Sequence, residues 1–137
     1  MERAFARSYD SLAAIYDFAE EFLAANKISE PERFPVHLAM EELFTNMVKY
    51  NPEVTGDIDV SITASDNKVT VILQEYGVDK FDVTTPVNVD TEAPLDARTP
   101  GGLGLFLIQN LVDTLDYEYD DGRSRVIFTK KSGIKHV

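Results

Sequence analysis

Two pairs of short alternating segments constrain the fold most strongly. In each pair, apolar and polar residues alternate on both sides of a polar turn, which is the pattern of two antiparallel strands with one buried face. The first pair turns at Ser65-Asp66-Asn67 and the second at Asp120-Asp121-Gly122. The alternating apolar positions are Ile58, Val60, Ile62, Val69, Val71 and Leu73 in the first pair, and Leu115, Tyr117, Tyr119, Val126 and Phe128 in the second. The sequence therefore predicts two β-hairpins.

Three segments show the periodicity of helices. Residues 11–26 are amphipathic, with Asp10 or Ser11 as the expected N-cap. Residues 30–50 follow a capping-box spacing at Ser29 and Glu32, and Pro35 predicts a bend or a regular start only near Phe34. The stripe of this second helix consists of Val36, Met40, Leu43, Met47 and Tyr50. The third helix is expected in LFLIQNLVDTL, directly after a glycine-rich segment.

The order of these segments predicts one α+β domain over residues 1–137. Helix, helix, hairpin, loop, helix and hairpin follow one another, and residues 3–8 could add a short edge strand. Strands joined by tight turns, with helices between them, favour a two-layer sandwich with one antiparallel or mixed sheet and helices on one face.

Composition excludes several classes of function. The 137 residues carry a net charge of −11, so direct nucleic-acid binding is not expected, and a basic partner protein suits the surface. No cysteine is present and the two histidines are far apart, which argues against thiolate or histidine metal clusters. No apolar run approaches the ~18 residues of a membrane span and no signal peptide is seen, so we expect a cytoplasmic protein.

One row of polar residues lies on the second predicted helix. Glu42, Asn46 and Lys49 follow at spacings of four and three, so they share a face beside the apolar stripe. A carboxylate, a carboxamide and an amine in this row could polarise a hydroxyl, hold Mg²⁺ and meet a phosphate. The same spacing is also common on solvated helix faces.

A second candidate is Gly101-Gly102-Leu103-Gly104, which leads into Leu105 and the third helix. Glycines allow close approach of the backbone, and a helix N-terminus attracts anions such as phosphate. The segment is neither a Walker loop nor a Rossmann fingerprint, and such segments also occur as ordinary turns.

A third candidate stands at the end of a predicted strand. Glu75, followed by Tyr76 and Gly77, could accept a hydrogen bond from the amino group of a base while the glycine leaves room for the ring. Residues 76–100 contain no regular pattern, and such long segments often form lids or binding loops.

Together, these motifs resemble the GHKL superfamily of histidine-kinase-like ATPases. ELFTN resembles its N box, EYGVDKFD stands at the G1 box, and GGLGLFLIQNLVD resembles the G2 box of bacterial anti-sigma-factor serine/threonine kinases. The similarity covers about residues 5–131. It implies a Bergerat fold, a two-layer sandwich with a mixed, mostly antiparallel sheet.

The resemblance also implies a function and roles for residues. ATP and Mg²⁺ would be bound, with Asn46 as the magnesium ligand and Glu42 as the general base. Lys49, Glu75, Gly77 and the segment 101–105 would contact the nucleotide, and residues 83–100 would form a lid. The partners implied are a sigma factor, an anti-sigma-factor antagonist that accepts the phosphate, and a second copy in a homodimer.

The chain departs from the family pattern at the G1 box. Glu75 stands where an Asp is expected, and the stretch from Gly77 to Phe81 is one residue longer than usual. Asp79 or Asp82 could compensate for the change. An alternative function is therefore a non-catalytic GHKL-fold module that binds a regulator with weakened or lost ATP binding.

Overall fold

A single five-stranded sheet organises the part of the chain that the computed structural model describes, residues 1–84 and 102–131. The elements follow in the order β1 (Glu2–Phe5), α1 (Leu12–Ala25), α2 (Glu30–Tyr50), β2 (Ile58–Ser65), β3 (Lys68–Glu75), α3 (Gly102–Leu111), β4 (Thr114–Asp120) and β5 (Arg123–Lys131). A short 3₁₀ turn at Tyr9–Ser11 precedes α1.

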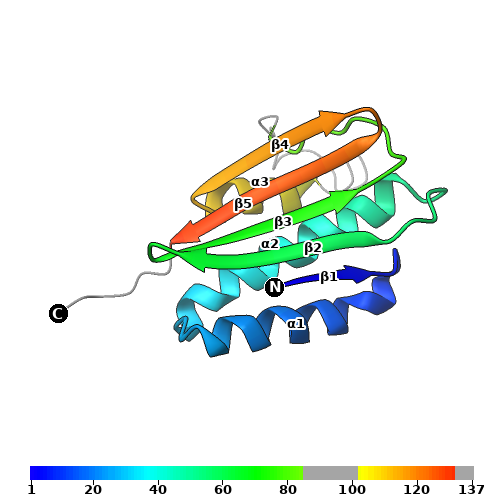
Figure 1. Ribbon diagram of the computed structural model, residues 1–137. Coiled ribbons are helices and arrows are strands. Elements are labelled where there is room, and N and C mark those ends of the chain that lie inside the picture. The colour runs from blue at the N-terminus through cyan, green and yellow to red at the C-terminus, as the bar shows by residue number, and fades with distance from the viewer. Residues whose placement is uncertain (85–101, 132–137) are drawn as a thin grey trace.

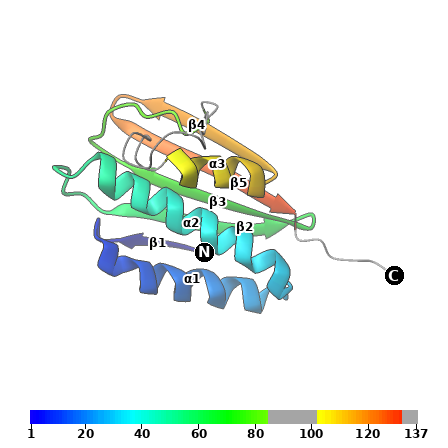
Figure 2. The same ribbon diagram turned by 180° about the vertical axis from the view of Figure 1, so that it is seen from behind.

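The strands are arranged β1-β2-β3-β5-β4, and every pairing among them is antiparallel. The sheet is thus fully antiparallel where we expected a mostly antiparallel, mixed one, because the return through α3 and β4 brings β5 back against β3. The three helices lie side by side on one face of the sheet, with α2 between α1 and α3 (Figures 1 and 2). This arrangement confirms the two-layer α+β prediction.

Both predicted hairpins are present, with turns of two residues. Asp66 and Asn67 have φ of 55° and 59°, and Asp121 and Gly122 have φ of 47° and 85°. Two successive left-handed residues form the turn whose twist matches that of the paired strands. Asn, Asp and Gly tolerate this conformation best, so the turn residues fix the register of both hairpins.

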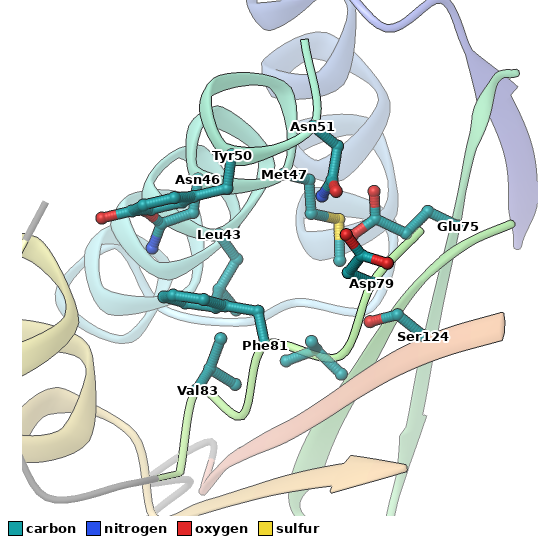
Figure 3. Close-up of a pocket in the computed structure, with 11 residues that line it drawn as sticks. Leu43, Asn46, Met47, Tyr50, Asn51, Glu75, Asp79, Phe81, Val83 and Ser124 are labelled. Carbon is teal, nitrogen blue, oxygen red and sulfur yellow. The ribbon is translucent and has the colours of Figure 1, made fainter. Parts of the chain in front are cut away.

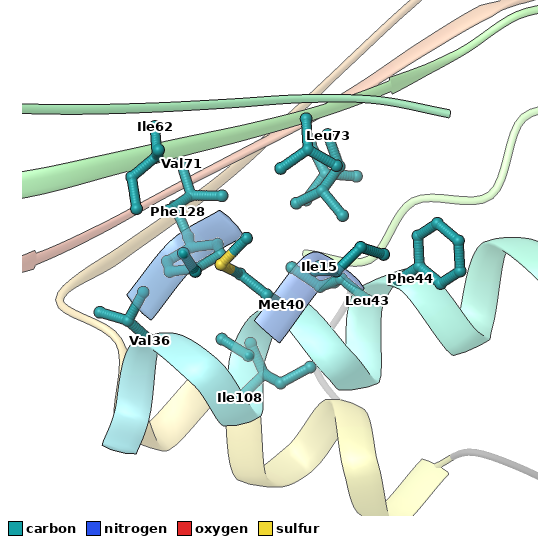
Figure 4. Close-up of a cluster of buried hydrophobic side chains, with 14 of the residues drawn as sticks. Ile15, Val36, Met40, Leu43, Phe44, Ile62, Val71, Leu73, Ile108 and Phe128 are labelled. Carbon is teal, nitrogen blue, oxygen red and sulfur yellow. The ribbon is translucent and has the colours of Figure 1, made fainter. Parts of the chain in front are cut away.

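The core lies between the sheet and the helices (Figure 4). The registers set Leu73 opposite both Val60 and Val126, and Val71 opposite both Ile62 and Phe128, so apolar residues form continuous rows across the sheet. Helix α2 covers these rows with the predicted stripe, of which only Tyr50 stays half-exposed. The same helix also buries residues outside that stripe, namely Ala39 and Phe44, because α1 and α3 flank it.

Several element ends differ from the predictions. Helix α1 lacks a side-chain cap at Ser11; instead the hydroxyl of Ser8 accepts a hydrogen bond from Asp10 N at 3.1 Å. The capping box at Ser29 does not form, and the Ser29 carbonyl accepts the first helical hydrogen bonds of α2. Helix α2 starts at Glu30 and continues through Pro35, which costs one helical hydrogen bond near its N-terminus.

Helix α3 begins earlier and ends earlier than predicted. It covers Gly102–Leu111, so two glycines lie in its first turn. It stops before Leu115 because the chain joins the sheet: Asp113 N donates to Thr129 O at 2.8 Å, and Thr114 begins β4 opposite Thr129. The expected edge strand over residues 3–8 is β1, which pairs with β2 over Glu2–Phe5 only.

Candidate functional site

A narrow cavity lies where α2 and β3 end and β5 begins (Figure 3). Its walls come from three sources: the last turns of α2, the end of β3 with the segment that follows it, and the start of β5. The lining residues are Leu43, Asn46, Met47, Tyr50, Asn51, Glu75, Asp79, Phe81, Val83, Ser124 and Val126. The free volume is about 20 Å³, enough for about one water molecule but not for a purine ring.

Two stacked aromatic rings close the cavity on one side. Tyr50 at the end of α2 and Phe81 have ring centroids 4.5 Å apart and an interplanar angle of 22°. Phe81 is 38% exposed, and its ring lies along that of Tyr50 at the edge of the cavity (Figure 3). A rotation of this exposed side chain would therefore change the shape of the cavity.

The three residues of the predicted polar row on α2, Glu42, Asn46 and Lys49, differ in their burial and in their contacts with the cavity. Asn46 is buried and lines the cavity, as the spacing suggested. Glu42 is half-buried one turn earlier. Lys49 is exposed and does not line the cavity, and its ammonium lies 6.0 Å from the centre of the Tyr50 ring.

Glu42 directly contacts the start of α3. A Cβ atom placed on Gly104 would lie 2.3 Å from Oε2 of Glu42 and 3.1 Å from its Cδ. No side chain larger than hydrogen fits at position 104 unless Glu42 moves. The glycine therefore serves here for close approach, and it places a carboxylate beside the first turn of a helix.

The first turn of α3 contains the remaining glycine-rich residues that the structure describes. Gly102 is the first residue of the helix, so its N–H and those next to it have no helical partner. Leu105 is buried in the core, and only its backbone could face a ligand. Gly101, the side chain of Leu103 and the predicted lid beyond Thr84 lie outside the described residues.

Glu75 forms a buried ion pair that the sequence interpretation did not foresee. Its Oε1 lies 2.8 Å from NH2 of Arg7, and the two side chains are 5% and 4% exposed. Burial raises the pKa of Glu75, while the hydrogen bond and the charge of Arg7 act in the opposite direction. Apart from this ion pair, the two facing atoms have no well-oriented hydrogen bond in the described structure.

Arg7 connects the N-terminal segment to the walls of the cavity. Its NH1 donates to Met47 O at 3.0 Å, near the end of α2, and its Nε donates to Gly56 O at 3.3 Å. A sequence signal for this contact exists. Arg7 stands two residues after the buried Phe5, and Glu75 continues the alternate buried positions of β3, so a period of two from each buried neighbour could have indicated that both side chains point inward.

The segment after β3 is held against the second hairpin. Gly77 has φ of 72°, a conformation that favours glycine, and this explains its position without a ligand. Val78 N donates to Gly122 O at 3.1 Å, and the Tyr119 hydroxyl donates to Val78 O at 2.8 Å. Phe81 N donates to the hydroxyl of Tyr117 at 3.0 Å.

Two aspartates of this segment differ in their contacts. Asp79 lines the cavity, is exposed, and makes no hydrogen bond or ion pair with any described residue. Asp82 does not line the cavity and accepts hydrogen bonds from the backbone and the hydroxyl of Thr84. These bonds lower the pKa of Asp82.

The described residues include neither a cluster of metal-binding side chains nor a membrane-spanning helix. Within 1–84 and 102–131, no three His, Cys, Asp or Glu side chains gather closely enough to hold a metal ion by themselves. No helix in the same ranges combines the length and hydrophobicity that a membrane span needs.

Solved structures share this fold. The RsbU and RsbW domains of Rv1364c from Mycobacterium tuberculosis match with a TM-score of 0.70 and 13% identity, over 96% of this chain and 31% of that one. A chain of the SiaB–SiaC complex from Pseudomonas aeruginosa matches with a TM-score of 0.61 and 17% identity, over 95% of this chain and 88% of that one. At these identities the likeness shows the fold alone.

Sequence comparison gives nearer relatives. The serine-protein kinase RsbW of Listeria monocytogenes is 35% identical over 108 residues, which cover 73% of this chain and 66% of the kinase. RsbW of Bacillus licheniformis is 29% identical over 91 residues, covering 62% of this chain and 56% of its own length. The matches thus span between about half and two thirds of the length of these relatives. The model of the histidine kinase-like ATPase domain matches residues 5–130, and the chain therefore belongs to that family.

Proposed function

We propose that the chain binds Mg²⁺-ATP and transfers the terminal phosphoryl group to a serine or threonine of a partner protein. The contact between the Glu42 carboxylate and Gly104 carries this proposal, because it brings a possible base beside the free N–H groups that begin α3. Helix N-termini of this kind bind phosphates. The RsbW relatives, which are named serine-protein kinases, support the reaction type.

The residues present suit a nucleotide, provided that Phe81 moves. Asn46 offers an amide oxygen in the cavity, and the absence of a side chain at Gly104 allows the Glu42 carboxylate to lie beside the first turn of α3. Asn46 would hold Mg²⁺, which neutralises phosphate charge when it is bound. Gly102 and Gly104 would bind phosphate oxygens through backbone N–H groups, and Glu42 would accept the proton of the attacking hydroxyl.

The proposed partners rest on the similarity of this chain to the RsbW relatives. We propose that the acceptor is an anti-sigma-factor antagonist, and that a sigma factor is sequestered by the same chain. The net charge of −11 favours a basic partner and would repel an antagonist that has gained a phosphate. A second copy of this chain is a further candidate partner.

A transfer assay with matched variants tests the reaction. Radiolabelled ATP, Mg²⁺ and a candidate antagonist are incubated with the wild type, Glu42→Gln or Glu41→Gln. Glu41 is the exposed neighbour of Glu42, so its variant controls for the loss of one charge. We expect labelled phosphoserine or phosphothreonine with the wild type and Glu41→Gln, and a loss of about 100-fold with Glu42→Gln. Equal transfer by all three proteins would remove Glu42 from the mechanism.

The alternative is a module that binds a regulator without using ATP. The cavity of about 20 Å³ and the ion pair that occupies Glu75 favour it. Calorimetry with ATP, with and without Mg²⁺, separates the two functions. Tight binding that depends on Mg²⁺ and disappears in Asn46→Ala supports the kinase, whereas the absence of heat in both titrations supports the binding module.

A further inference from the structure

Two carboxylates face the same cavity in opposite electrostatic settings. Glu75 at the end of β3 is buried and paired with Arg7, whereas Asp79 is exposed and has no partner among the described residues. Figure 3 shows both carboxyl groups on the side of the cavity opposite Asn46. Both carboxylates could accept a further hydrogen bond, because only Oε1 of Glu75 is paired with Arg7, but Asp79 alone would do so with a charge that no described cation opposes.

Glu75 cannot leave Arg7 without a large cost. The Arg7 guanidinium is buried and is fixed by the carbonyls of Met47 and Gly56 as well as by Glu75. A rotation of the Glu75 carboxylate away from Arg7 would leave a buried positive charge without its counterion, which is strongly unfavourable. In place, the Glu75 charge is opposed by Arg7 at 2.8 Å, so it attracts a ligand donor less than a free carboxylate does.

Asp79 has the opposite properties. Its side chain lies on the segment that follows Gly77 and faces the cavity, two residues before Phe81, whose ring must turn away from Tyr50 for any flat ligand to enter. A purine that replaces the Phe81 ring could then stack on Tyr50, with the Asp79 carboxylate across the cavity from that ring (Figure 3). Hydrogen bonds to a charged acceptor are stronger than those between neutral groups.

We propose that Asp79 accepts the hydrogen bond from the exocyclic amino group of the purine, and that Glu75 serves as the structural counterion of Arg7. The proposal rests on the nucleotide binding proposed above and assigns its specificity-determining residue. It predicts that this chain distinguishes ATP from purine riboside triphosphate, which has hydrogen in place of the amino group, through Asp79.

Calorimetry with these two nucleotides and Mg²⁺ tests the assignment in four proteins. They are the wild type, Asp79→Ala, the control Asp82→Ala, and the double variant Arg7→Met, Glu75→Leu. Asp82 is the matched acid of the same segment that does not line the cavity. The double variant replaces the ion pair by apolar groups, and such replacements of buried ion pairs often leave protein stability unchanged. Glu75→Gln alone would leave the buried charge of Arg7 without a counterion. Thermal unfolding checks that each variant is folded.

The expected result is a preference for ATP over the analogue of about 10- to 100-fold in the wild type, in Asp82→Ala and in the double variant. Asp79→Ala should bind both nucleotides with the weaker affinity. Retention of the preference in Asp79→Ala overturns the assignment, and its loss in the double variant alone shows that Glu75 reads the base. In both cases nucleotide binding itself stands. If the wild type binds neither nucleotide, the proposed function fails and the assignment fails with it.

Discussion

Because Glu42 contacts Gly104, the substitution Gly104→Ala, which adds one methyl group, tests the kinase proposal. In Gly104→Ala, the new Cβ would lie 2.3 Å from Oε2 of Glu42, whereas ordinary contacts begin near 3.4 Å. The carboxylate must therefore retreat by about 1 Å. A displacement of this size at a reacting group can reduce a rate by about 100-fold.

The stability of the same variant should change little. Gly104 lies in the first turn of α3 without a positive φ, so alanine is allowed there and gains up to about 1 kcal/mol in helix propensity. The atom that must move is the end of a flexible side chain, and an unfavourable rotamer costs about 0.5–1.5 kcal/mol. We expect the two effects to offset each other to within about 1 kcal/mol.

The assay is single-turnover transfer from saturating Mg²⁺-ATP to the acceptor protein, with thermal unfolding measured in parallel. Gly56→Ala is the matched control, because nothing lies within 4 Å of a Cβ at that position. We expect wild-type transfer in Gly56→Ala and about a hundredfold slower transfer in Gly104→Ala. A wild-type rate in Gly104→Ala would refute the role assigned to the position of Glu42. If transfer were slow and the variant were also much less stable, the effect would not be confined to the Glu42 carboxylate, and the reasoning would be refuted.

Three further changes have defined outcomes. Phe81→Ala should raise the affinity for ATP severalfold in calorimetry, because it removes the ring stacked on Tyr50, and Phe106→Ala, at the same 38% exposure, should not. Arg7→Met should lower the free energy of unfolding by about 3–5 kcal/mol in urea denaturation, because it leaves a buried carboxylate unpaired; a loss below 1 kcal/mol would contradict this. Hydrogen bonding to His37 and the charge of Arg33 lower the pKa of Glu20 from 4.5, so wild type should exceed Glu20→Gln in stability above that pH. Since the ion pair is partly exposed, the difference should stay below about 1 kcal/mol and disappear as pH falls through the lowered pKa, as unfolding curves at several pH values can show.

The hairpins and the helix stripes could be predicted because local periodicity determines them. A period of two with a polar turn leaves little freedom for the chain, and the registers follow from the turn residues. The end of α3 could not be predicted in this way. Residues 112–115 fit a helical pattern, but pairing between Thr114 and Thr129 draws them into the sheet.

The placement of candidate site residues could be predicted where spacing along one helix determines it, and less so where distant segments meet. Glu42 and Asn46 were singled out from their spacing, and the structure places Glu42 beside the start of α3 and Asn46 in the cavity. The ion pair between Arg7 and Glu75 was not predicted, because patterns along the sequence do not pair residues from two distant segments. In the stack of Tyr50 and Phe81, Phe81 lies outside any helix or strand, so no periodicity in the sequence predicts this contact.

The hydrogen bond between Phe81 N and the Tyr117 hydroxyl has a kinetic consequence. It fixes the backbone at the position whose side chain blocks the cavity, so the block is removed by rotation of one exposed ring and not by displacement of the chain. Rotations of this kind take picoseconds to nanoseconds, whereas hinge motions take microseconds or longer. Nucleotide association should therefore follow a single exponential whose rate rises linearly with ligand concentration, without a plateau set by an opening step.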